Sequence, residues 1–464
     1  MSREFDLLVI GGGPGGYTAA IRASQLKIRT GIIERDRLGG VCLNWGCIPT
    51  KALIRNAELF QAFKKGGEWG ISYDNLRVDF GVVIRRSRGV ADRVSKGVEY
   101  LMKKNAIEHM PGAARLVAND TVELAAAGKP VEQVRAKHII LATGARPRTI
   151  PGVPIDRHRV ITSTEAMALA SQPASMIIIG AGAIGIEFAY FYNALGTKVT
   201  VVEMLPGILP IEDRELTKQL ESSLRKQGIT ILTGTTVERV IPGAREVRVA
   251  VSGGGEKKEL AGEVALMAIG VQGNVENLGL EKLGVTVAKN HIQVDAHYRT
   301  TVPGLYAIGD VIGPPWLAHV ASAEGTHCVE AIAGLNPEPI DYTSVPGCTY
   351  CQPQVASVGL TEEQARDKGY ELKIGKCPFR PLGKAMAIGE SEGMVKLIFD
   401  AKYGELLGAH ILGSEATEMI AELVVAKRLG TTGKDLSGAI HAHPTLSEAV
   451  MEAAGAAYGE SINL

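Results

Sequence analysis

The chain has 464 residues, too many for one hydrophobic core, so two to four domains are expected. Its 50 lysines and arginines balance its 50 aspartates and glutamates, which leaves no basic surface of the kind that nucleic-acid-binding proteins use. No uninterrupted run of about 18 apolar residues could span a bilayer, and the first residues carry no secretory signal, so a cytoplasmic protein without a membrane partner is expected.

Two segments of the chain have the pattern of a dinucleotide-binding strand, turn and helix. In each, an apolar strand (residues 5–10 and 175–180) leads into the pattern G-x-G-x-x-G, which comprises Gly11, Gly13 and Gly16 in the first copy and Gly180, Gly182 and Gly185 in the second. The first glycine permits a tight turn, the second lets the backbone approach a pyrophosphate, and the third allows close helix packing. One such pattern is weak, but two copies in this context indicate two nucleotide-binding units.

A carboxylate follows each glycine pattern at the same spacing. Glu34 and Glu203 each lie 23 positions after the first glycine of their unit. A carboxylate at the end of the second strand accepts hydrogen bonds from ribose hydroxyls and repels a 2′-phosphate. Because no arginine follows Glu203 closely, the second unit is expected to prefer NAD over NADP.

The order of the strands predicts that one nucleotide unit is inserted into the other. A strand that ends before Thr143 and Gly144 precedes the second unit, whereas a strand that ends at Asp310 follows it. The expected domains are a first nucleotide domain (1–150 and 276–343), an inserted domain (151–275), and an α+β domain (344–464) with helices over 414–429 and 446–457. The predicted fold class is α/β, with two Rossmann-like domains and a C-terminal α+β domain.

Cys42 and Cys47 lie between Glu34 and a helical pattern that runs from Ala52. This places both sulfurs at a helix N-terminus, where the helix dipole and free backbone amides favour thiolate over thiol. As a structural disulfide, so short a ring would contribute only about 2 kcal/mol. Six cysteines in so long a chain are no disulfide scaffold, so this pair is expected to be catalytic.

The segment 39–51, Gly-Gly-Val-Cys-Leu-Asn-Trp-Gly-Cys-Ile-Pro-Thr-Lys, resembles the redox-active motif of the class I pyridine nucleotide-disulfide oxidoreductases. Its second half is most similar to the dihydrolipoamide dehydrogenase branch of that family. The resemblance covers the whole chain, including both glycine patterns, T-V-P-G-L-Y-A-I-G-D (301–310) and His-Ala-His-Pro-Thr-Leu-Ser-Glu (441–448).

This resemblance implies a function and partners. FAD is expected in the first nucleotide unit, NAD in the inserted unit, and a homodimer interface in the last domain. A Cys42–Cys47 redox disulfide is expected to oxidise dihydrolipoamide, carried on the lipoyl domain of a partner protein, and to reduce NAD⁺ through FAD. The chain would then serve a 2-oxo acid dehydrogenase or glycine cleavage complex.

The resemblance also assigns roles to single residues. His443, the histidine before Pro444, is implied to be the base, with Glu448 orienting it, and to reach the disulfide of the other subunit; His441 is left as structural. Cys42 is implied to face the substrate and Cys47 the flavin. Further implied cofactor contacts are the pair Lys51 and Glu187 beside the flavin, Ala114, Thr143, Gly144, Asp310 and Ala318 for FAD, and Val237 and Gly270 for NAD.

Three alternatives remain at this stage. A glutathione reductase would share the dithiol but prefer NADP, and a mercuric reductase usually has a further cysteine pair near its end, where this chain has Ser-Ile-Asn-Leu464. A catalytically idle flavoprotein scaffold would not need the intact dithiol and base. Separately, Cys348 and Cys351 form a C-x-x-C pattern, which suggests zinc or redox chemistry. No further pair follows at zinc spacing, and a strand beside a proline accounts for the pattern. Cys328 and Cys377 are expected to be small apolar fillers.

Overall fold

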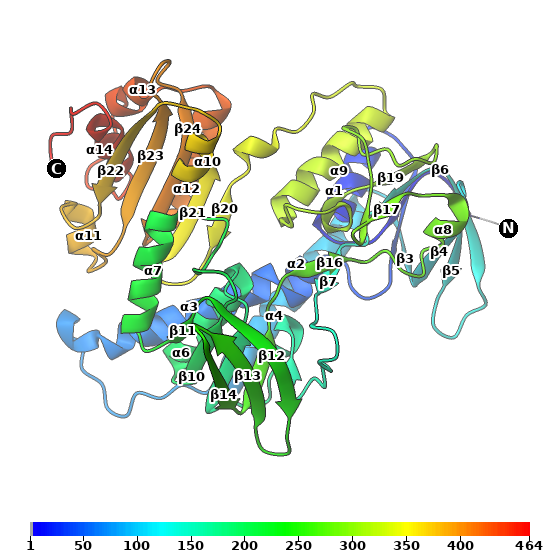
Figure 1. Ribbon diagram of the computed structural model, residues 1–464. Helices are drawn as coiled ribbons and strands as arrows, with labels where there is room; N and C mark the ends of the chain where they lie inside the picture. Colours follow the sequence, from blue (N-terminus) through cyan, green and yellow to red (C-terminus); the bar gives the residue numbers. More distant parts are fainter. Residues whose placement is uncertain (1–2) are drawn as a thin grey trace.

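In the computed structural model, which describes residues 3–464, the largest sheet joins segments from both sides of the second nucleotide unit (Figure 1). The strand order is β3-β2-β1-β6-β5-β4, and β19 pairs in parallel with the end of β6. The chain therefore returns to this sheet after it has formed the inserted unit. The strands are β1 (Arg3–Ile10), β2 (Thr30–Glu34), β3 (Glu108–Pro111), β4 (Ala113–Ala118), β5 (Thr121–Ala125), β6 (Glu132–Leu141) and β19 (Leu305–Ala307).

Both faces of this sheet are buried. Because side chains alternate along a strand, Leu7 and Val9 of β1 pack under helices on one face, and Leu8 and Ile10 pack into a second core with β4 and β5. This explains why residues 7–10, the second half of β1, form a continuous apolar run. The helices of this part are α1 (Pro14–Gln25), α2 (Gly40–Trp45), α3 (Cys47–Lys64), α4 (Phe80–Lys104) and α9 (Ala318–Ile332).

Helix α3 begins earlier than the sequence pattern predicted. The expected start was Ala52, but the helix starts at Cys47, directly after Gly46. Pro49 lies in its first turn, where a missing backbone amide breaks no helical hydrogen bond. The predicted start at Ala52 was therefore wrong, and the observed start places Cys47 in the first turn of the helix.

The second sheet is parallel throughout, in the order β11-β10-β9-β15-β8. Helix α6 packs on one face, and the antiparallel strands β12-β13-β14 cover the other. The elements are β8 (Val160–Ile161), α5 (Ser163–Ala166), β9 (Ser175–Ile179), α6 (Ala183–Leu195), β10 (Lys198–Val202), α7 (Arg214–Lys226), β11 (Thr230–Leu232), β12 (Thr235–Pro242), β13 (Val247–Gly253), β14 (Glu256–Gly262) and β15 (Val264–Met267).

The third sheet is antiparallel, in the order β20-β21-β24-β23-β22, with α12 and α14 packed on one face. Its elements are β20 (Gly347–Thr349), β21 (Gln354–Gly359), α10 (Glu362–Asp367), β22 (Leu372–Pro378), α11 (Gly383–Ala387), β23 (Met394–Asp400), β24 (Leu406–Gly413), α12 (Ala416–Arg428), α13 (Gly433–Gly438) and α14 (Glu448–Ala456). With this sheet in place, the predicted fold class is confirmed.

Short elements connect the three sheets. The two segments that link the first sheet to the second pair with each other, as β7 (Ala145–Pro147) and β16 (Val271–Gly273). The others are η1 (Gly66–Trp69), α8 (Leu280–Leu283), β17 (Val287–Ala288), β18 (His291–Ile292), η2 (Gly309–Ile312) and η3 (Tyr342–Ser344). No helix within residues 3–464 combines the length and the apolar character that crossing a membrane requires.

Helix α7 belongs to the second nucleotide unit but packs against the third sheet, as Figure 1 shows. Its apolar face, which includes Leu216 and Leu220, shares a core with Met394 and Leu412 of that sheet. The pattern of α7 is strongly amphipathic, and this sheet covers its apolar side. The inserted unit is therefore fixed to the C-terminal part of the chain by continuous packing.

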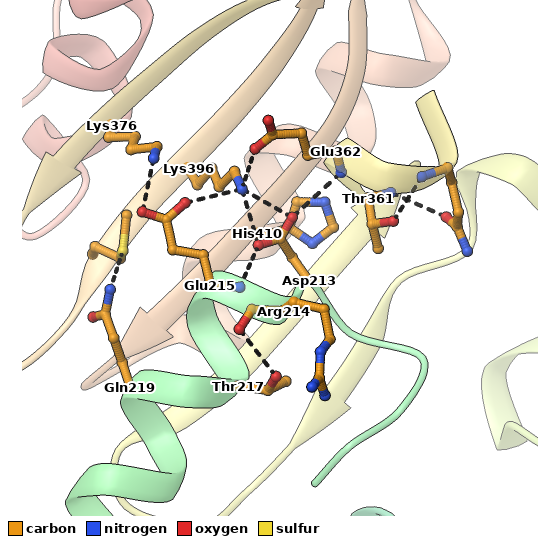
Figure 2. Close-up of polar contacts among 12 residues, drawn as sticks. Asp213, Arg214, Glu215, Thr217, Gln219, Thr361, Glu362, Lys376, Lys396 and His410 are labelled. Atoms are coloured by element: carbon orange, nitrogen blue, oxygen red, sulfur yellow. Dashed lines mark hydrogen bonds and ion pairs between the residues drawn. The ribbon is translucent and has the colours of Figure 1, made fainter. Parts of the chain in front are cut away.

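A buried lysine lies at the edge of this contact (Figure 2). The ammonium of Lys396, in β23, is 3.0 Å from both carboxylate oxygens of Asp213, 3.0 Å from Glu215 and 2.8 Å from Glu362. The side chain of Lys396 is 2% exposed. Asp213 also accepts a hydrogen bond from the Glu215 amide and so caps the start of α7. Ion pairs and packing thus hold the same helix.

Replacing Lys396 by methionine is expected to destabilise the protein by about 3 kcal/mol, because buried carboxylates would lose their cation. The measurement is the midpoint of urea unfolding. Lys376→Met is the matched control: Lys376 also binds Glu215, at 2.7 Å, but its side chain is 43% exposed, so a change below about 1 kcal/mol is expected. Equal effects of the two substitutions would contradict this assignment.

Candidate active site

The two glycine patterns form the same turn after the first strand of their units. Gly11 and Gly180 have φ angles of 109° and 104°, in the left-handed region that only glycine adopts without strain. A Cβ on Gly11 would overlap the carbonyl oxygen of Ala142, and one on Gly180 would overlap that of Ala268. Backbone therefore approaches backbone in both turns, as the sequence pattern predicts.

Glu34 and Glu203 hold these turns in the same way. The Oε2 atom of Glu34 accepts a hydrogen bond from the amide of Gly12 at 2.6 Å, and its Oε1 accepts one from the amide of Asp36 at 2.8 Å. Both carboxylates are buried, and each oxygen keeps a lone pair for a ribose hydroxyl. The same two contacts recur at Glu203, with Ala181 (2.7 Å) and Leu205 (2.8 Å).

The side of each turn where a pyrophosphate would lie is open. A Cβ on Gly13 would approach only the Cα atom of Gly40, at 3.9 Å, and one on Gly182 would meet no atom within 4 Å. Helices α1 and α6 begin directly after these glycines, and among residues 3–464 no side chain caps either N-terminus. Their first amides can therefore bind an anion, and the two turns fit the pyrophosphates of two dinucleotides.

The other predicted cofactor contacts lie in several segments. Thr143 and Gly144 lie where the chain leaves the first sheet, and hydrogen bonds tie them to Asn274, where the chain returns. Asp310 lies in η2, and burial raises the pKa of its carboxyl to about 6. The remaining residues, whose roles stay predictions, are Ala114 in β4, Ala318 in α9, Val237 in β12 and Gly270 before β16.

Cys42 and Cys47 lie on either side of the junction between α2 and α3, and both are free thiols. A hydrogen bond between the two sulfurs lowers the pKa of Cys47. Burial raises this pKa and the ammonium of Lys51 lowers it, and the net result is a pKa of about 7. The same hydrogen bond, together with burial, raises the pKa of Cys42. Cys47 is therefore the more acidic thiol of the pair.

The cation beside Cys47 is held by a buried carboxylate. The ammonium of Lys51 lies 3.0 and 2.9 Å from the two carboxylate oxygens of Glu187, whose side chain is 6% exposed. Lys51 comes from α3 and Glu187 from α6, so this ion pair connects the cysteine helix to the second nucleotide unit. The two residues that the sequence analysis paired are thus in contact.

Tyr350, which the sequence analysis did not single out, completes this contact. Its backbone amide donates a hydrogen bond to Glu187 at 3.0 Å, and the ammonium of Lys51 lies 4.4 Å from the centroid of its ring. A cation over an aromatic face is attracted by the ring quadrupole. Tyr350 follows β20 in the third part of the chain, and only its position between Cys348 and Cys351 could have drawn attention to it.

His443 and Glu448 form the predicted pair at the C-terminal end. The Nδ1 atom of His443 lies 2.9 Å from a carboxylate oxygen of Glu448, and the imidazole is 77% exposed. The pKa of the Glu448 carboxyl is lowered by a hydrogen bond from the backbone amide of Thr445 and by the contact with His443. His441 differs: its side chain is 7% exposed and its Nε2 atom lies 2.8 Å from Glu422. Only His443 presents its ring to an incoming group.

The pair formed by His443 and Glu448 lies far from Cys42 and Cys47 of the same chain. Helix α14, which begins with Glu448, lies at the outer end of the third sheet, whereas α2 lies between the first and second sheets (Figure 1). Within residues 3–464, no hydrogen bond or ion pair joins His443 to Cys42 or Cys47. A site that uses both groups would need a second copy of the chain.

Two family models match the chain. The model described as pyridine nucleotide-disulphide oxidoreductase matches residues 5–325, and the one for the dimerisation domain of these enzymes matches residues 345–454. The chain belongs to the pyridine nucleotide-disulphide oxidoreductase family. Family membership confirms the predicted FAD and NAD cofactors, which the two open glycine turns fit.

Similar members of this oxidoreductase family include two curated proteins named dihydrolipoyl dehydrogenase. The one from Rhizobium etli is 47% identical over 100% of both chains, and the one from Chlorobaculum tepidum is 47% identical over 98% of this chain and 97% of its own. Among solved structures, the HOCl-induced flavoprotein disulfide reductase RclA from Escherichia coli, as its Cu(II) complex, has a TM-score of 0.89 at 27% identity, and LpdA from Mycobacterium tuberculosis has 0.90 at 26%. Each alignment covers 98% of this chain and 99% of the other.

The other cysteines of this oxidoreductase differ from Cys42 and Cys47. Burial raises the pKa of Cys348 to about 11 and also raises that of Cys351, whose thiol donates to the carbonyl oxygen of Pro353. Cys328 and Cys377 are fully buried in apolar cores. Within the described residues, Cys47 is thus the cysteine whose pKa is lowered.

The Cys47 thiolate should govern the reactivity of the reduced enzyme. Because its pKa is about 7, its alkylation by iodoacetamide should rise with a midpoint near pH 7. Lys51→Met should move this midpoint upward by about one pH unit, since an opposite charge is lost and Glu187 stays. Mass spectrometry of the Cys47 peptide gives the rate, with Lys64→Met at the end of α3 as control. An unchanged midpoint in Lys51→Met would contradict the assignment.

Proposed function

We propose that this oxidoreductase is a dihydrolipoyl dehydrogenase, which oxidises dihydrolipoamide to lipoamide and reduces NAD⁺. The observation that carries the proposal is the Cys42–Cys47 pair beside the Lys51–Glu187 ion pair, whose ammonium lowers the pKa of Cys47. Full-length relatives with 47% identity carry this name. Both oxygens of Glu203 accept from backbone amides, and Glu203 forms no ion pair within residues 3–464, which supports NAD rather than NADP as the acceptor.

The thiol half of the reaction uses this chain's own side chains. His443 takes a proton from one thiol of dihydrolipoamide, and the resulting thiolate attacks Cys42 of the Cys42–Cys47 disulfide. The S–S bond breaks and Cys47 leaves as a thiolate, which Lys51 stabilises. The second substrate thiol then attacks the mixed disulfide, releases Cys42 and closes lipoamide. When bound, FAD and NAD carry the two electrons away from this dithiol.

We further propose that the protein works as a homodimer in which His443 and Glu448 of one subunit serve the cysteines of the other. The match of residues 345–454 to a dimerisation domain and the separation of α14 from α2 support this. The proposed domains are residues 1–150 with 276–343 for FAD, 151–275 for NAD, and 344–464 for the interface. Partners would be lipoyl domains of a cytoplasmic 2-oxo acid dehydrogenase or glycine cleavage complex.

An anaerobic comparison of two substrate pairs tests this function. Dihydrolipoamide with NAD⁺ should give rapid NADH formation, whereas glutathione disulfide with NADPH should give turnover at least about a hundredfold slower. Cys47→Ser should abolish lipoamide turnover and the absorption band that a thiolate forms with bound flavin. The reverse substrate preference would identify a glutathione reductase instead, and no dithiol-driven NAD⁺ reduction at all would indicate a non-catalytic scaffold.

The two histidines offer a second test. His443→Gln should lower kcat with dihydrolipoamide by about 10² to 10⁴-fold, because the thiol loses its general base. Reduction of the bound flavin by NADH should stay unchanged, because that half of the reaction does not use the thiol base. His441→Gln is the matched control and keeps a hydrogen bond to Glu422. If His441→Gln lost activity and His443→Gln kept it, the roles would be reversed.

A further inference from the structure

A buried carboxylate on α9 contacts the turn that carries Asp310. Glu324 lies near the middle of this helix and is 2% exposed. Its Oε2 atom accepts a hydrogen bond from the backbone amide of Gly309 at 2.7 Å. Gly309 has a φ angle of 71° and opens η2, in which Asp310 is the next residue. Glu324 therefore holds the backbone directly before the predicted flavin contact.

The second oxygen of Glu324 is held from a different part of the chain. Its Oε1 atom accepts a hydrogen bond from the hydroxyl of Tyr342 at 2.6 Å, and that hydroxyl lies 3.0 Å from the hydroxyl of the buried Tyr298. Tyr342 belongs to η3, which directly precedes the third sheet, and is 43% exposed. A chain of hydrogen bonds thus runs from the segment before the third sheet to the turn at Gly309.

The chemistry of Glu324 argues against a simple packing role. Within residues 3–464, neither lysine nor arginine forms an ion pair with it, and its oxygens are satisfied by the Gly309 amide and the Tyr342 hydroxyl. Burial, with the nearby carboxyl of Asp310 as a further contribution, raises the pKa of Glu324. Burying such a group costs free energy that hydrogen bonds must offset, whereas a leucine would fill the same volume without that cost. This position therefore requires the two carboxylate oxygens of Glu324, which accept these hydrogen bonds.

We propose that Glu324 is a positioning residue of the flavin site, which fixes the Gly309–Asp310 turn, and that Tyr342 fixes Glu324 from the segment before the third sheet. The proposal rests on FAD binding by this family and on Asp310 as a flavin contact. It does not depend on which thiol is the substrate, so it is tested by properties of the bound flavin and not by turnover.

The test compares three variants of the full-length holoenzyme. Glu324→Leu should speed FAD release on dilution, followed by flavin fluorescence, at least about tenfold and should shift the visible spectrum of the bound flavin, because the Gly309 amide loses its acceptor. Glu324→Gln should restore both properties, since its carbonyl oxygen can accept from Gly309 and its amide nitrogen can face Tyr342. Glu330→Leu, on the same helix, should behave as the wild type because Glu330 instead binds Arg22.

The three variants also separate hydrogen bonding from charge. If Glu324→Gln released FAD as fast as Glu324→Leu, the negative charge and not the hydrogen bond would matter, and the proposal would be overturned. Equal release from Glu324→Leu and Glu330→Leu would overturn it as well.

Should Glu324→Leu fail to fold, Tyr342→Phe provides the same test at a half-exposed position. It removes only one hydroxyl, so FAD release is expected to be about threefold faster with the fold unchanged in circular dichroism. A flavin spectrum and a release rate identical to those of the wild type would show that Tyr342 does not fix Glu324. A failure of the dihydrolipoamide assay would leave these flavin measurements unaffected, so the two proposals fail separately.

Discussion

The ion pair between Lys51 and Glu187 is the contact on which the arrangement of the site depends. Lys51 lies on the cysteine helix, Glu187 lies on α6 of the second nucleotide unit, and the Tyr350 amide reaches Glu187 from the third part of the chain. A carboxylate that leaves water loses several kcal/mol of solvation, so Glu187 is stable there only while its partners are in place. Three segments are therefore held at one point beside Cys47.

The inserted unit is held at a second point, on a different helix. There Lys396 is surrounded by Asp213, Glu215 and Glu362, and apolar residues of α7 share a core with the third sheet (Figure 2). Because α6 is fixed through Glu187 and α7 through Lys396, the second nucleotide unit is tied both to the cysteine helix and to the C-terminal part. This arrangement keeps the two nucleotide turns in a constant relation to the dithiol, which a transfer of electrons between several carriers requires.

The two cysteines differ because of their surroundings, although the sequence presents them as similar. Cys47 opens α3 one turn before Lys51, and its thiolate receives a hydrogen bond from Cys42 and the field of the ammonium. Cys42 lies inside the short helix α2 and loses acidity as the donor of that bond. The leaving sulfur of the disulfide is thus the one that the structure stabilises as an anion, which matches the direction of the proposed exchange.

The sequence by itself determined the features that depend on local chemistry. The turns at Gly11 and Gly180 follow from backbone angles that other residues avoid, and the spacing to Glu34 and Glu203 follows from the length of one strand–helix–strand unit. Local pattern failed at the start of α3, which was predicted at Ala52 and lies at Cys47, with Pro49 in the first turn. Tertiary structure alone decided the roles of Tyr350, Glu324 and Lys396. Each is an ordinary residue of its own segment. Tyr350 contacts Glu187 and Lys396 contacts Asp213, each more than 100 positions away, whereas Glu324 contacts the turn and the linker that fold against its helix.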